Sequence, residues 1–190
     1  MIEIAWWVGS FLGRFVLYQW PFAFETCLFV HHLVGASKTR EQGPTLSWFY
    51  SILLTQIVCY GGDSLSKLFM RKPSLMFTNF HVLVPLGLLC WVLVNKCDIV
   101  YRYLKRPVVR ELVVAIFEIH RAHRTLNIID LANHQGCNPL VGPILAGTIV
   151  ATSSGDLLQM SKEGEEEVTK TRVVIWNLRA GLLASALYQL

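Results

Sequence analysis

The sequence predicts an all-α membrane protein that crosses a bilayer several times, and three observations support this fold class. Of its 190 residues, 53% are hydrophobic and only 16% are charged, whereas a soluble domain carries about 25% charged residues. The apolar residues gather in runs of about 20, the length that a helix needs to cross a bilayer. A globule of this size also has too little interior to hide so many apolar side chains from water.

Six apolar windows, separated by charged residues, proline or glycine, are predicted to form the spanning helices. In chain order they cover about 11–34, 45–65, 74–94, 107–129, 140–158 and 173–190. Ahead of them, a short stretch with Trp6 and Trp7 is expected at the membrane surface; it lacks the basic start and cleavage site of a signal peptide. The last window ends without a polar tail, so we expect a shortened chain.

Lysine and arginine in the loops predict the orientation, because basic residues near the ends of spans stay cytoplasmic. The loops after the first, third and fifth windows hold nine of them, the loop after the second holds three, and the stretch before the first holds none. The N-terminus is therefore expected on the side away from the cytoplasm.

Small residues followed by an acid occur at matching places in two windows. They are Gly61, Gly62 and Asp63 in the second window, and Ser153, Ser154 and Gly155, followed by Asp156, in the fifth. We expect both helices to be interrupted there, because adjacent glycines hold a helix weakly and serine can bond the freed backbone groups. Close packing of helices at small residues is the alternative.

The windows are predicted to form one domain over 1–190, made of two inverted three-helix repeats at about 11–95 and 107–190. In that arrangement the two interruptions face each other near mid-membrane, as they do around an ion or solute site.

The fourth window carries charged residues at helical spacing. Arg110, Arg121 and Arg124 fall on one stripe, roughly 60 degrees wide, and Glu118 can pair with Arg121 three residues later. A charge at the centre of a membrane helix costs at least about 2.5–3.5 kcal/mol. We therefore expect Arg121 and Arg124 to face a water-filled cavity, acidic partners or an anionic lipid head group. A helix whose ion pairs only lock packing, or one that lies at the interface, is the alternative.

Other signals exclude several kinds of site. His31 and His32 are adjacent and point in different directions on a helix, so we expect at most one to face the interior, which argues against a metal site. No enzyme motif, phosphate-binding loop or paired Cys-x-x-Cys is present, so neither catalysis nor a cofactor is predicted. The net charge is only +4, and the sequence lacks the basic stripe of a nucleic-acid binder, so nucleic-acid binding is not predicted.

An ordered set of short motifs resembles the trimeric intracellular cation channels over about residues 20–190. The set comprises Pro21-Phe22, His31-His32-Leu33-Val34, Ser47-Trp48-Phe49, Tyr60-Gly61-Gly62, Thr78-Asn79, Cys97-Asp98, Pro107-Val108 and the stretch from Phe117 to Arg124. That last stretch is similar to the family pattern Lys-Glu-Val-x-Arg-x-x-Lys. Glu118, Ile119 and Arg121 match it, Arg124 replaces the final lysine, and Phe117 stands where the first lysine is expected.

The resemblance implies a homotrimer with a pore in each subunit, and seven helices, of which this sequence is expected to lack the last. It implies potassium flux across the endoplasmic or sarcoplasmic reticulum that balances charge during calcium release, with the N-terminus luminal. In the family, the first lysine and the arginine bind phosphatidylinositol 4,5-bisphosphate. Lipid binding is thus implied for Arg121, with Arg124 or Arg110 as replacements for the missing lysine.

Two other functions remain open at this point. A secondary transporter could use the same repeats, with the arginines holding an anionic solute. A non-conducting membrane adaptor could use its small-residue faces for assembly alone.

Overall fold

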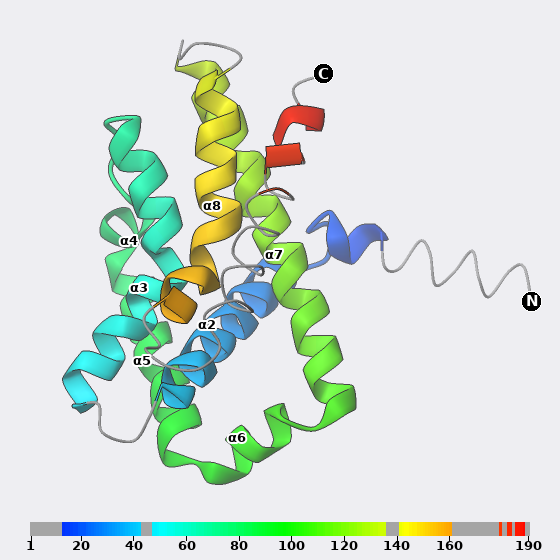
Figure 1. Ribbon diagram of the computed structural model, residues 1–190. Coiled ribbons are helices and arrows are strands. Elements are labelled where there is room, and N and C mark those ends of the chain that lie inside the picture. Colours follow the sequence, from blue (N-terminus) through cyan, green and yellow to red (C-terminus); the bar gives the residue numbers. More distant parts are fainter. Residues whose placement is uncertain are drawn as a thin grey trace, which may run out of the picture.

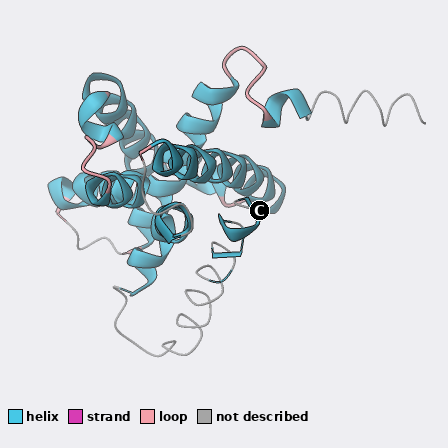
Figure 2. Ribbon diagram, turned by 90° about the horizontal axis from the view of Figure 1, so that it is seen from above, coloured by secondary structure: helices cyan, strands magenta, loops and turns pink. Residues whose placement is uncertain are grey.

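The computed structural model describes residues 13–42, 47–135, 141–160, 179, 182–183 and 185–188, with only the backbone described over 153–160. The described residues form helices and loops without any strand (Figures 1 and 2). The helices are α2 (Ala23–Glu41), α3 (Trp48–Phe69), α4 (Leu75–Thr78), α5 (Phe80–Lys96), α6 (Asp98–Leu104), α7 (Pro107–His134) and α8 (Val141–Met160). The all-α prediction is confirmed.

Each of the first five predicted windows contains a helix: α2, α3, α5, α7 and α8 in turn. The sixth window, 173–190, is described only at 179, 182–183 and 185–188, which are helical. The remainder of that window lies outside the described residues, as do Trp6 and Trp7.

The first helix begins later than the sequence predicts, at Ala23 instead of near residue 11. A separate helical turn at 13–16 precedes it. Between the two, Tyr18 and Phe22 adopt left-handed backbone angles, with φ of 53° and 67°. Pro21 lacks a backbone N–H and disfavours helix in the residue before it, so one continuous helix cannot form through this stretch.

α2 lies within the bundle and packs against α3, α5 and α7, while α8 packs against α3 and α7 (Figure 1). Apolar side chains meet at these contacts. The first cluster joins α2, α3 and α5 through Leu28, Cys59, Tyr60 and Leu83. The second joins α2 and α5 through Leu33, Ala36, Cys90 and Val94. The third joins α7 and α8 through Ile128, Ala132, Ala146 and Val150. The first and third clusters border the cavity described below.

The expected interruptions of two helices are not present. α3 continues as one helix through Gly61, Gly62 and Asp63, and the backbone of α8 continues as one helix through Ser153, Ser154 and Gly155. A glycine costs a helix only about 1 kcal/mol, and packing against neighbouring helices outweighs such a cost. α3 packs against α2, α5 and α8, which explains why the glycine pair does not break it.

Close helix approach occurs at other glycines. A Cβ atom added to Gly35 of α2 would lie 2.5 Å from Cys59 Sγ of α3, and one added to Gly87 of α5 would lie 2.0 Å from Gln56 Nε2 of α3. Small residues therefore do permit tight packing in this protein, but at Gly35 and Gly87 instead of at Gly61, whose added Cβ would meet only Ile57 Cγ2 at 3.7 Å.

Among the described residues, no helix by itself combines the length and mean hydropathy of a membrane span; α5 and α6 reach both together, as a pair bent by 93°. α2 pairs with α7, and α3 pairs with α8. In two related three-helix units, the first helices of the units, α2 and α7, would pair, and so would the second helices, α3 and α8. The division into inverted repeats at 11–95 and 107–190 stays a prediction.

Candidate functional site

A cavity of about 420 Å³ lies between α2, α3, α4, α5 and α7. Its polar lining residues are Tyr60, Asp63, Lys67, Asn79, His120, Arg124 and Asn127, and the remainder of the lining is apolar. The volume is within the range of small-ligand sites, and since one water fills about 30 Å³ of liquid, several waters fit. The cavity is therefore a largely apolar space inside a single subunit into which several polar and charged groups project.

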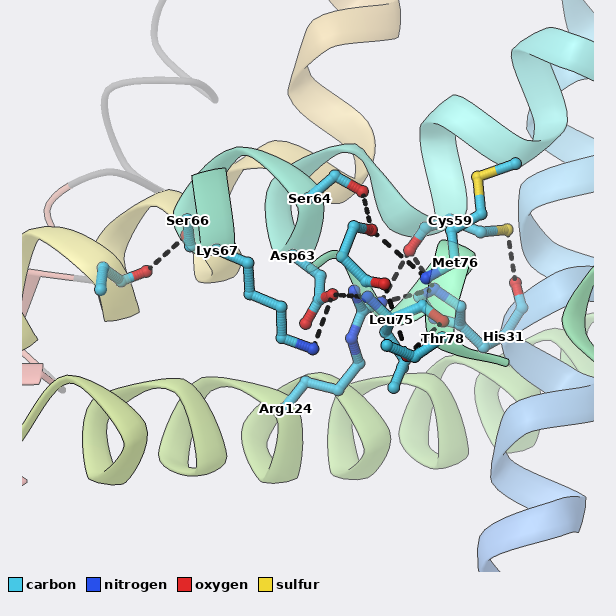
Figure 3. A network of polar contacts seen from close by, with 12 residues as sticks. His31, Cys59, Asp63, Ser64, Ser66, Lys67, Leu75, Met76, Thr78 and Arg124 are labelled. Atoms are coloured by element: carbon cyan, nitrogen blue, oxygen red, sulfur yellow. Dashed lines mark hydrogen bonds and ion pairs between the residues drawn. The ribbon is translucent and has the colours of Figure 1, made fainter. Parts of the chain in front are cut away.

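Arg124 crosses from α7 to α3 at this cavity (Figure 3). Its Nη1 donates a hydrogen bond to the backbone oxygen of Cys59 at 2.7 Å and lies 3.1 Å from His31 Nε2. Its guanidinium carbon lies 5.5 Å from the centre of the Tyr60 ring. The Nε atom is buried and has no hydrogen-bond partner among the described residues. These contacts hold the guanidinium against α3 through backbone and aromatic groups.

The acid of the cavity is paired with a lysine. Asp63 is only 4% exposed, and its Oδ2 lies 3.2 Å from Nζ of Lys67, one helical turn later. The same oxygen accepts a hydrogen bond from the backbone N–H of Leu75 at 3.4 Å, which ties α3 to the start of α4. Because Lys67 neutralises Asp63, the charge of Arg124 remains as the net charge of the cavity lining.

His31 and His32 are both buried, at 1% and 0% exposure, so the expectation that at most one faces the interior is wrong. α2 is covered by α3, α5 and α7, and opposite sides of this helix are therefore both interior. His32 Nδ1 donates to the backbone oxygen of Leu28 at 2.8 Å, which leaves Nε2 to accept from the hydroxyl of Tyr60 at 2.8 Å. This histidine ties α2 to α3.

A second polar chain connects the segment before α2 with α7. The hydroxyl of Tyr18 lies 3.0 Å from His120 Nδ1, and the Tyr18 ring stacks on His123 with centroids 3.9 Å apart. His120 in turn approaches His31, with ring centroids 5.0 Å apart. The Tyr18 contacts fasten the stretch before α2 to the helix that carries Arg124.

The three arginines predicted to form one stripe have different surroundings. Arg124 lines the cavity, whereas Arg121 lies outside it and pairs with Glu118, with Arg121 Nη2 2.5 Å from Glu118 Oε2. The Arg121 side chain is 31% exposed, and Arg110, near the start of α7, is exposed. The helix repeat alone places them on one stripe, but only Arg124 lies deep enough along α7 to reach α3.

The remaining predicted residues are also distributed over the fold. Asp63 lines the cavity, and Gly61 and Gly62 lie one turn or less before it inside α3. The side chains of Ser153 and Ser154 and the surroundings of Gly155 lie outside the described residues.

Sequence reasoning gave no site role to several cavity residues, namely Lys67, Asn79, Asn127 and His120, although Asn79 and His120 stand within the short motifs of the resemblance. Lys67 carried a usable signal, since an acid and a lysine four residues apart on a helix are typical of an ion pair. Asn127 follows Arg124 by three residues and therefore shares its face of α7. Asn79 lies between α4 and α5, and only the fold brings it to this cavity.

A bundle of largely apolar helices around a cavity lined by Asp63, Lys67 and Arg124 is typical of helical membrane proteins that handle ions or polar solutes. A family model that describes the TRIC channel matches residues 34–190. The chain belongs to the TRIC channel family, which is a family of intracellular multi-pass membrane channels and not of enzymes.

Solved structures show the same fold. The chain resembles a trimeric intracellular cation channel from C. elegans determined with bound Ca²⁺, at a TM-score of 0.75 and 20% identity, covering 98% of this chain and 84% of that one. The C. elegans channel determined without Ca²⁺ gives a TM-score of 0.73 and 17% identity, with 94% and 81% covered. Comparison with curated protein sequences gives no significant match.

Proposed function

We propose that this protein is a potassium-selective channel of the endoplasmic or sarcoplasmic reticulum membrane, which passes counter-ions while calcium is released. It acts as a homotrimer with an ion path in each subunit and with its N-terminus in the lumen. The observation that carries this proposal is the charged cavity inside a single subunit of a cation-channel family member. The trimeric state of the C. elegans channels supports the assembly.

The cavity offers suitable groups for a partly hydrated monovalent cation. Asp63 supplies carboxylate oxygens, and Asn79 and Asn127 supply amide oxygens around a space that holds several waters. Oxygen ligands of this kind replace part of an ion's hydration shell in channels. Gly61 and Gly62 leave no side chain on α3 beside Asp63, and we place them, with Ser153, Ser154 and Gly155, along the ion path.

Arg124 acts in this proposal as the electrostatic barrier of the path. A fixed positive charge repels cations, so conduction requires that it be compensated by an anionic group or moved by the membrane voltage. Displacing one charge through 100 mV is worth about 2.3 kcal/mol, which is enough to shift an equilibrium between a blocking and an open position.

Asp63→Asn tests the proposal in planar-bilayer recordings of the purified protein. The substitution removes the only carboxylate of the described cavity lining and leaves Lys67 and Arg124 uncompensated. We expect K⁺ current from the native protein and a loss of roughly tenfold in the variant, since one added charge at about 10 Å costs about 1.7 kcal/mol at an effective dielectric constant of about 20. Absence of K⁺ current from the native protein would refute the channel assignment.

Glu111→Gln is the matched control, because Glu111 is exposed on α7 and does not line the cavity. Its removal should leave the K⁺ current unchanged. An equal loss in both variants would mean that the effect of Asp63→Asn is not local to the cavity.

Regulation by phosphatidylinositol 4,5-bisphosphate is part of the proposal, with Arg121, Arg124 and Arg110 as the lipid-binding residues. The amine of Lys38 lies 5.3 Å from the centre of the Phe117 ring. This lysine of α2 therefore supplies a cation beside the position where the family pattern has one, which supports the assignment. Guanidinium groups also suit phosphate because of their planar fork of donors.

Arg121→Gln should raise the phosphoinositide concentration needed for the half-maximal response of the K⁺ current by about tenfold or more, since a hydrogen bond to a charged group contributes about 1.5–3 kcal/mol. The measurement is a lipid titration in the same bilayers, with Lys72→Gln, an exposed cation after α3, as the control. An unchanged titration curve for Arg121→Gln would remove Arg121 from the lipid site.

An anionic-solute transporter is the second candidate, and the net positive charge of the cavity lining favours it. Liposome uptake distinguishes the two functions: electrically silent, saturable anion uptake without K⁺ current would establish the transporter. A protein that gave neither current nor uptake would instead be a membrane adaptor.

A further inference from the structure

α6 lies across the end of the bundle, at an angle of 93° to α5 (Figure 1). One side of this short helix packs on the core, since Tyr101 and Leu104 contact the apolar cluster of Leu33 and Cys90. Its opposite side is open. In the channel proposed above α5 crosses the membrane, and on that basis a helix at a right angle to α5 runs parallel to the membrane plane, which is the position of an interfacial helix.

Two ion pairs fasten the packed side of α6 to the end of α2. Arg40 donates to Asp98 and to the backbone oxygen of Val94, and Lys105 pairs with Glu41. The Tyr101 ring lies beneath both cations, 4.2 Å from the guanidinium carbon of Arg40 and 5.5 Å from Nζ of Lys105. Through its hydrogen bond and charge, Arg40 lowers the pKa of Asp98, so the pair persists at mildly acidic pH and is lost only as the pH falls through that lowered pKa.

The open side of α6 is amphipathic and basic. Ile99, Arg102 and Tyr103 follow one another at helical spacing, which places them on one face of α6. Arg106 lies two residues beyond the end of the helix at Leu104. Ile99 is 78% exposed and Tyr103 is 54% exposed, and both arginines are exposed. The guanidinium carbon of Arg106 lies 5.4 Å from the centre of the Tyr103 ring. The two nearby carboxylates, Asp98 and Glu41, are already engaged by Arg40 and Lys105.

We propose that this face of α6 rests in the head-group layer of the bilayer and binds anionic phospholipid. Arg102 and Arg106 contact lipid phosphates, while Ile99 and Tyr103 enter the boundary with the acyl chains. Tyrosine prefers this depth because its ring is apolar and its hydroxyl is polar, and each basic residue near an anionic surface strengthens binding roughly fivefold. The predicted orientation makes this the cytoplasmic leaflet, so α6 anchors the end of α5 there.

Fluorescence of a label on α6 tests the proposal without measuring ion current, so its outcome is independent of the channel assignment. Cys97 and Cys137 are replaced by serine, Ile99→Cys is introduced and coupled to an environment-sensitive dye, and the full chain is placed in neutral or phosphatidylserine-containing vesicles. We expect a blue-shifted emission and quenching by head-group-level quenchers, both stronger in the anionic vesicles.

Arg102→Gln combined with Arg106→Gln should lower the ratio of shielded to water-exposed label in anionic vesicles by roughly twenty-fivefold, at about fivefold per residue. Replacement of both by lysine should restore the shift, and Lys72→Gln, an exposed cation after α3, should leave it unchanged. A water-exposed label in both vesicle types would overturn the proposal. A label that is equally shielded in anionic vesicles, in neutral vesicles and in lipid-free detergent would also overturn the proposal, because it would indicate that a neighbouring subunit covers α6.

Discussion

Replacing Arg124 by glutamine is expected to raise the single-channel K⁺ conductance by on the order of tenfold. Arg124 is the cation of the cavity lining that no carboxylate neutralises, since Asp63 is paired with Lys67. At an effective dielectric constant of about 20, a unit charge about 10 Å from an ion raises its energy by about 1.7 kcal/mol, and glutamine removes that barrier. Unitary currents of the purified protein in symmetric KCl give the measurement.

Two control variants separate charge from structure. Arg124→Lys keeps the positive charge and should retain the low conductance, although it loses the planar donor fork. Arg121→Gln removes a cation that lies outside the cavity and pairs with Glu118, so its conductance without added phosphoinositide should match the native value. Equal conductance of Arg124→Gln and the native protein would show that ions do not pass this arginine.

Gly35→Val is expected to destabilise the folded protein by about 1–3 kcal/mol, the usual cost of overpacking a filled interior. A Cβ atom at this position would lie 2.5 Å from Cys59 Sγ and 3.7 Å from the backbone oxygen of Thr55, so α2 and α3 would have to separate. For a chain of this length the melting temperature should fall by roughly 5 °C. Thermal unfolding in detergent, followed by size-exclusion chromatography, measures the shift.

Gly61→Ala is the matched variant on the other helix and should not lower the melting temperature. The added methyl group would make only an ordinary contact, 3.7 Å from Ile57 Cγ2, and alanine favours an uninterrupted helix by about 1 kcal/mol over glycine. A K⁺ current that survives this substitution would agree with the continuous α3. A current abolished in a stably folded Gly61→Ala variant would mean that conduction requires α3 to break at this point.

Hydropathy alone predicted the positions of most helices. An apolar run that enters a bilayer must hydrogen-bond its own backbone groups, and a helix does so without help from other segments. The start of the first helix was missed, since the left-handed angles at Tyr18 and Phe22 are local backbone geometry that a hydropathy window does not detect. The interruption expected at Gly61 and Gly62 was wrong because the helix penalty of glycine is small compared with the packing of α3 against its neighbours, chiefly α2, α5 and α8.

The sequence by itself determined the all-helical class, the basic loops and the family of the protein, because composition and short motifs are properties of the linear chain. The tertiary structure alone decided that Arg124, and not Arg121 or Arg110, enters the cavity, and that both His31 and His32 are buried. These outcomes depend on which distant helix lies against each side chain. The packing of α2, α3, α5 and α7 together decides which helix lies against each side chain, and helical periodicity within one segment cannot predict it.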